Sequence, residues 1–262
     1  MGHLGRLLQD VRRAIAVAQR NGNNLWVSAF AGIEAWLRTL CFDFDGARKL
    51  CESVLTCGRE RANRTPNCLA LLFLGYAEIG AGNSRDALRH FSAIEEITVE
   101  KFYLHWYWRM QAQLGACNAW LNLNNLANAT RKADLLRAAV SETEDPNLLA
   151  LAWEMKARIA IAASDNQEAR KYIIKSVEGL QSVEIPLTAW HVHATAWHIL
   201  HEWEEEQAEH HRHIAQTLIE QIAVAFPDDE PIRAKFLAVP MVREVLEGVP
   251  ATHPPTSSAA SL

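Results

Sequence analysis

Small residues recur through this chain in pairs that lie twelve positions apart. The second member of each pair is an alanine, and the five alanines follow one another after 40, 42, 40 and 39 residues. The pairs are Ala35 with Ala47, Gly75 with Ala87, Cys117 with Ala129, Ala157 with Ala169, and Ala196 with Ala208. Small side chains allow two antiparallel helices to approach closely, so each pair predicts one helix hairpin. Five hairpins in register predict stacked repeats, and an irregular helical bundle is the alternative.

Hydrophobic periodicity and breakers place these hairpins along the chain. Pro66, Pro146 and Pro186 each open a first helix, and Asp165 with Glu168 forms a capping-box-like start for a returning helix. We expect an all-α fold, a right-handed α-solenoid of about five antiparallel helix pairs with a period of about 40 residues. An extra N-terminal helix over Leu4–Arg20 and a C-terminal helical cap complete the predicted domain, residues 1–248. The Pro- and Ser-rich residues 249–262 are expected to be a disordered tail.

The C-terminal cap is a specific prediction. A last repeat leaves one apolar face without a neighbour. We expect Ile232–Leu246 to fold back on the helix from Ala208 to Phe226, with Phe236 and Leu237 as the main buried side chains.

The N-terminal helix predicts something about the context of the chain. By the period, Leu4–Arg20 is the second helix of a hairpin whose first helix is missing. We therefore expect the chain to be cut from a longer protein, and a lone N-terminal capping helix is the alternative.

Composition excludes several classes of function. The net charge of −5 argues against a nucleic-acid-binding surface. No apolar run reaches the roughly 18 residues that cross a bilayer, and the N-terminus has no signal-peptide core. The five cysteines lack metal spacing and are expected to be reduced, mostly buried thiols of a cytoplasmic protein: Cys41, Cys51, Cys57, Cys68 and Cys117.

Motifs for catalysis are absent from the sequence. It contains no P-loop, dinucleotide fingerprint or nucleophile elbow, so we expect no enzyme, no catalytic residue and no cofactor. Histidines cluster late in the chain, and the spacing of His198 and His201 allows both on one helix face. No cysteine or matching acid completes a tetrahedral zinc set, so we expect no metal.

The stretch Leu74–Phe91 carries a resemblance to a known family. Gly75, Ala87 and Phe91 stand at the spacing of the tetratricopeptide (TPR) repeat, although only this repeat has Leu-Gly at the signature positions. The chain also resembles the TPR-like C-terminal region of large bacterial signalling proteins, including maltose-regulon-type transcriptional activators. The residues that carry this second resemblance are Glu168–Arg170, Pro186–Ala196 and Pro231–Leu246. It implies an upstream ATPase, kinase, cyclase or DNA-binding domain in a longer chain.

TPR-like geometry also implies a concave groove lined by the first helix of each pair. Two positions on that helix face inward, and they predict a binding groove that contains aromatic and polar side chains: Trp36, Tyr76, Asn118, Glu154, Arg158, His193 and Trp197. Aromatic anchors beside polar groups suit a peptide or a small effector.

Three functions follow as hypotheses. The first is a protein-interaction or ligand-sensing module that regulates an attached or partner signalling or transcription output, with no membrane or direct nucleic-acid partner. The second is a metal-binding or enzymatic helical domain that uses the late histidines. The third is a structural oligomerisation spacer.

Overall fold

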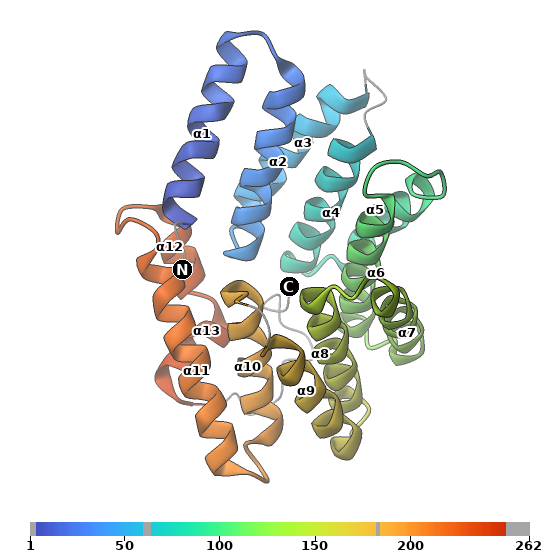
Figure 1. Cartoon of the computed structure of the whole chain (residues 1–262), viewed down its shortest axis with the longest axis vertical. Coiled ribbons are helices and arrows are strands. Elements are labelled where there is room, and N and C mark those ends of the chain that lie inside the picture. The colour runs from blue at the N-terminus through green and yellow to red at the C-terminus, as the bar shows by residue number, and fades with distance from the viewer. Residues whose placement is uncertain (1–3, 60–63, 182–183, 250–262) are drawn as a thin grey trace. The chain divides into compact units, whose positions relative to one another are not determined.

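The computed structural model describes residues 4–59, 64–181 and 184–249, and within these ranges every regular element is an α-helix (Figure 1). The expected disordered tail therefore lies outside the described residues, apart from Val249. The thirteen helices in the described part are α1 (Leu4–Arg20), α2 (Asn24–Leu40), α3 (Phe44–Arg59), α4 (Arg64–Gly80), α5 (Ser84–Ile97), α6 (His105–Asn122), α7 (Leu126–Thr143), α8 (Pro146–Ala162), α9 (Asn166–Leu180), α10 (Pro186–Leu200), α11 (Glu205–Val224), α12 (Pro231–Leu237) and α13 (Pro240–Glu247).

The helices divide into two compact units. The first unit comprises residues up to Gly115 together with Val224–Phe236, and the second comprises Ala116–Ala223 with the residues from Leu237 onward. Helix α6 contributes to both. In the first unit, each helix from α1 to α4 packs on the helix that follows it, and α2 also touches α4. In the second unit, each helix from α7 to α9 packs on the helix that follows it, and α8 also touches α10. The all-helical, repeat-like prediction is confirmed at this level.

The pairs of small residues lie where the helices of each hairpin meet. All ten are buried, and in the third hairpin the Cys117 thiol donates a hydrogen bond to the Ala129 carbonyl at 3.3 Å. At Gly75, a Cβ atom would lie 2.4 Å from the ring of Phe91, which packs edge-on against Tyr76. The spacing that predicted the hairpins therefore marks their closest contacts.

The same turn follows α1 and the first helix of the first four hairpins. One residue adopts a left-handed conformation with φ between 54° and 80°, and the N–H of the next residue bonds to the carbonyl five residues earlier, as in a Schellman motif. The left-handed residues are Gly22, Phe42, Gly82, Asn124 and Ser164. Each is followed by Asn or Asp, and four of these five side chains cap the next helix. The predicted cap by Asp165 is confirmed, since its carboxylate accepts from the Glu168 N–H at 3.1 Å.

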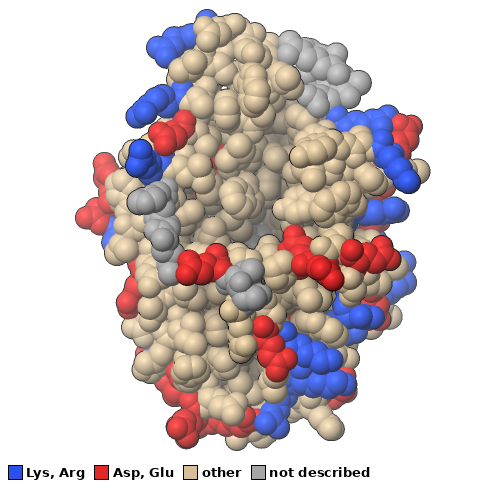
Figure 2. Space-filling model, viewed as in Figure 1, with Lys and Arg blue, Asp and Glu red and all other residues tan. Residues whose placement is uncertain are grey.

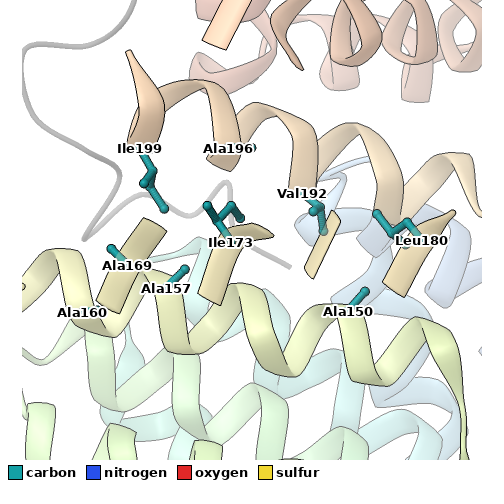
Figure 3. Packing of buried hydrophobic residues seen from close by; sticks show 9 residues of the cluster. All are labelled: Ala150, Ala157, Ala160, Ala169, Ile173, Leu180, Val192, Ala196 and Ile199. Atoms are coloured by element: carbon teal, nitrogen blue, oxygen red, sulfur yellow. The ribbon is translucent and has the colours of Figure 1, made fainter. Parts of the chain in front are cut away.

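The core of the second unit is built from alanines and β-branched residues. Figure 3 shows nine of them on α8, α9 and α10, with Ile173 of α9 between Ala157 and the α10 side chains. Ser176 is also fully buried there, and its hydroxyl donates to the Ala150 carbonyl at 2.7 Å. Because the alanines have short side chains, the three helices can pack closely.

The predicted cap is only half right. Helix α13 packs within the second unit, where Arg212 of α11 donates to the Val245 carbonyl at 3.3 Å. Helix α12 instead belongs to the first unit, and Phe236 stacks on Phe42 with ring centroids 6.5 Å apart. Phe236 is fully buried, as predicted, but the partners that hold α12, Phe42 and Asp43, belong to the first unit and were not predicted. Leu237 is only partly buried.

Four cysteines are buried free thiols: Cys41, Cys51, Cys68 and Cys117. Burial raises the pKa of each of these thiols to about 12, so they are unreactive in the folded protein. The side chain of Cys57 lies outside the described residues. None of the described helices combines the length and the apolar character needed to span a membrane.

Candidate functional site

A shallow apolar hollow of about 500 Å³ lies between α1 and α2. We call it the α1–α2 hollow, and its lining residues are Asp10, Arg13, Ala14, Val17, Ala18, Asn21, Asn23, Trp26 and Phe30. Trp26 and Phe30 stack with ring centroids 5.4 Å apart, one helical turn from each other. Trp26 is 52% exposed, so a large apolar surface faces solvent here.

The later repeats explain why this hollow is open. Phe30 stands five residues before Ala35, and the four equivalent residues are all buried: Ala70, Ala112, Ala152 and His191. In the second hairpin, α4 is covered by α2, the first helix of the preceding hairpin. Gly32 of α2 lies directly against Leu69 of α4. In the first repeat, by contrast, Phe30 is only partly buried and Trp26 is 52% exposed.

Charged groups border the hollow along α1. Asp10 lies between Arg6 and Arg13, with ion-pair distances of 3.9 and 3.5 Å, and all three side chains are exposed. In the view of Figure 2, the surface over α1 and α2 is mostly uncharged, and basic side chains follow the outer edge of α1, whose cations are all arginines. An apolar floor with a charged border is the arrangement expected of a protein-binding surface.

Three of the predicted groove residues form a buried polar network in the second unit. We call it the α6–α8–α10 network, and its members are Asn118, Glu154, Arg158, His191 and Thr195. Arg158 donates to Asn118 at 3.3 Å, and Thr195 donates to Glu154 at 2.7 Å. The Nδ1 atom of His191 lies 2.8 Å from the same Glu154 oxygen. The network thus links three successive first helices through their polar side chains.

Electrostatics in this network favour the ionised carboxylate. Burial alone would raise the pKa of Glu154, but His191, Arg158 and Thr195 outweigh it, and the pKa is lowered. Burial lowers the pKa of Arg158, and the Glu154 charge opposes that shift. The Nε of Arg158 and the Nε2 of His191 are buried without a hydrogen-bond partner. These two nitrogen atoms therefore have unused hydrogen-bonding capacity. An unpaired buried donor destabilises a fold.

The remaining predicted groove residues have different surroundings. Trp36 is 40% exposed. Tyr76 and Trp197 are buried, Tyr76 against Phe91 and Trp197 between the rings of His198 and His201. His193 is half-buried, and its Nδ1 lies 2.9 Å from Nδ1 of His211 on α11. Five of the seven predicted residues are therefore buried, His193 is half-buried and Trp36 is exposed.

The late histidines pack mainly with one another and with aromatic rings. The pKa of His193 is lowered to about 4, mainly by burial and also by the neighbouring His211 and His210. Burial also lowers the pKa of His198 to about 4, with a smaller contribution from His201. Among the described residues, no group of three or more His, Cys, Asp or Glu side chains is arranged to hold a metal ion.

Sequence reasoning missed the α1–α2 hollow and two members of the network. The signal for Trp26 and Phe30 was present, because aromatic residues stand in the first repeat where the repeat pattern has mostly smaller ones. The signal for the network was the shared register of Asn118 and Arg158, each directly after its small marker residue.

The comparisons with known proteins support the fold alone. No protein-family model matches the chain, and no curated protein matches it. A solved structure with a similar fold is the crystal structure of BtubC (BKLC) from P. vanneervenii, with a TM-score of 0.59 and 13% sequence identity. The similarity covers 87% of this chain and 95% of that chain. The chain therefore has an all-helical, repeat-like fold shared with this protein.

Proposed function

We propose that this chain is a protein-binding helical-repeat module, and that the α1–α2 hollow takes an α-helix of a partner protein. The observation that carries this proposal is the Trp26–Phe30 stack, in which Trp26 is 52% exposed, whereas the residues equivalent to Phe30 are buried in every later repeat. A partner helix lying on α2 would continue the stacking that α2 and α4 already make.

The chemistry of the hollow defines the partner helix. Its apolar face would carry Ala, Leu or Val against Val17, Trp26 and Phe30. An acidic residue near the end of that face would pair with Arg13 or Arg6, which are two exposed cations of α1. Trp and Phe at the centre of such a surface contribute most of the binding free energy.

The finer features of the fold belong to the same proposal. Five antiparallel pairs of the TPR-like type would wind into a right-handed solenoid, whose concave groove would hold Trp36 and His193 as its more accessible residues. A peptide or small effector bound there is the second site of this proposal. By the resemblance to bacterial signalling proteins, binding would regulate an attached or partner ATPase, kinase or DNA-binding domain.

The test begins with crosslinking from the hollow. Trp26 is replaced by the photo-crosslinking residue p-benzoylphenylalanine, and the matched control carries it at Trp203, which is 48% exposed and lies in the second unit. We expect crosslinks from position 26 to one helical segment of a partner, identified by mass spectrometry.

The segment is then synthesised and titrated against the purified protein. Phe30→Asp is expected to weaken its binding about tenfold or more, whereas Trp203→Asp leaves binding unchanged. Equal crosslinking from both positions, or binding that survives Phe30→Asp, would contradict the proposal. Metal analysis of the purified protein with and without His198→Ala tests the alternative metal-binding function.

A further inference from the structure

The 230–236 segment, Glu230–Phe236, binds the first unit through both of its ends. At its start, Glu230 accepts two hydrogen bonds from Arg12 of α1, at 2.8 and 3.2 Å. This bidentate geometry fixes both distance and orientation. The third donor of Arg12, Nε, bonds to Glu34 of α2 at 3.2 Å, so Glu230 joins an existing pair of charged groups.

The other end of the segment is held by a charge and a ring. Lys235 donates to the Asp43 carboxylate, which also accepts from Arg38 and from the Gly46 N–H. Next to it, Phe236 stacks on Phe42 with an interplanar angle of 22°. Ile232 and Phe236 are fully buried, although they lie in α12, a helix of only seven residues.

Phe42 provides an independent observation. It occupies the left-handed position of its turn with φ of 60°, where the equivalent turns have Gly82, Asn124 and Ser164. A bulky aromatic residue is strained in this conformation, and such strain persists only where the surroundings stabilise it. The Phe42 ring packs edge-on against Phe44, with centroids 6.0 Å apart, and stacks on Phe236, so it joins this turn to the 230–236 segment.

We propose that Arg12, Phe42 and Asp43 form a docking site for a short helix, and that the 230–236 segment occupies it as a displaceable intramolecular ligand. The partner that this docking site would bind is a helix of another protein chain that carries the same pattern as the segment. The pattern is an acidic residue, an aliphatic residue two positions after it, and a Lys-Phe pair five and six positions after it. This proposal does not depend on the α1–α2 hollow, because none of these three residues lines it.

Two features make the segment exchangeable. Both of its ion pairs include a cation that reaches solvent, since the side chains of Arg12 and Lys235 are 37% and 45% exposed. Water and salt therefore compete for these charges. A seven-residue helix bounded by Pro231 and Pro240 also has little stability of its own, so it depends on the docking site.

The probe is a fluorescein-labelled peptide of residues 228–239, measured by anisotropy against the full chain. The opened variant carries Glu230→Lys and Lys235→Glu, which reverse both charges of the segment. We expect this variant to bind the peptide at least tenfold more tightly than the wild type does. Adding Phe42→Asn, the residue type of the equivalent turn at Asn124, is expected to weaken that binding at least tenfold.

Hydrogen exchange of the wild-type protein provides a second measurement that requires no variant to fold. Saturating peptide should accelerate exchange of the α12 amides, while α8 and α9 remain protected. The proposal is overturned if the opened variant binds no better than the wild type, or if Phe42→Asn leaves its binding intact. It is equally overturned if saturating peptide leaves α12 exchange unchanged.

Discussion

The two units stabilise a buried carboxylate in different ways. In the first unit, Asp43 is paired with cations that reach solvent. In the second, Glu154 is surrounded by Arg158, His191 and Thr195, all of which are buried. The cations around Asp43 can exchange their partner for water, because they reach solvent. The buried groups around Glu154 have no such alternative, and their network therefore fixes three helices in register.

The largest expected effect on stability comes from removing each carboxylate in turn. Glu154→Ala leaves Arg158 charged and buried without its partner, and we expect a loss of about 3–5 kcal/mol in the free energy of unfolding. Asp43→Ala should lose only about 1–2 kcal/mol, since Arg38 and Lys235 can turn to water. Urea denaturation measures both. Equal losses would show that solvent access does not distinguish the two networks.

A lower pH should destabilise the second unit more than the first. The pKa of His193 is about 4 in the folded protein, below the ordinary value of about 6.5. The unfolded chain therefore binds more protons between these values, and stability falls as the pH drops from about 6.5 to 4, by about 3 kcal/mol for His193 alone. The lowered pKa of His198 acts in the same direction.

The first unit should keep its carboxylate pairs over that range. Burial alone would raise the pKa of Asp43, but hydrogen bonds from Lys235 and Arg38 lower it below its ordinary value. Its contribution is therefore complete above about pH 4 and is lost only as the pH falls below that value. Hydrogen exchange at pH 7 and pH 5 should show faster opening of α10 and α11 than of α1 and α2. Uniform acceleration in all helices would contradict this assignment.

Two glycine substitutions compare packing in the two units. Gly75→Ala places a Cβ 2.4 Å from the Phe91 ring, and the resulting overpacking should cost about 1–3 kcal/mol. In the second unit, a Cβ at Gly179 meets Ala150 at an ordinary 3.8 Å, so Gly179→Ala should stabilise α9 by up to about 1 kcal/mol. Thermal unfolding of both variants checks the opposite signs. The same sign for both would show that the packing distances do not control the outcome.

Salt should give the smallest effect. Raising sodium chloride from 0.1 to 1 M shortens the Debye length from about 10 to 3 Å. We expect this change to accelerate exchange of the α12 amides severalfold and to leave α8 nearly unaffected, because Glu154 and Arg158 of α8 are buried. An α12 that is insensitive to salt would indicate that its apolar contacts alone hold it in place.

Local patterns in the sequence predicted most of the fold. Ala87 and Ala169 marked the hairpins because a helix interface has room only for small residues at those positions, and Asp145 and Asp165 cap the helices that follow them. The position of α12 was unpredictable, since Glu230 pairs with Arg12 over 218 residues and no local pattern encodes that contact.

The candidate sites were only partly predictable. Asn118, Glu154 and Arg158 were correctly assigned to the first helices, but the sequence does not say that they bond to one another rather than to a ligand. The exposure of Trp26 depends on how α1 and α2 pack, and an aromatic pair in a helix is equally compatible with a core.

The buried cysteines can serve as internal probes of local unfolding. A thiol whose pKa is about 12 is alkylated at neutral pH only when its surroundings open. Cys41 precedes the turn that contacts α12, and Cys117 lies in the second unit at the α6–α7 contact. With Cys57 replaced by Ser, the modification rates of these two thiols would report separately how often each half of the protein unfolds locally, without any added label.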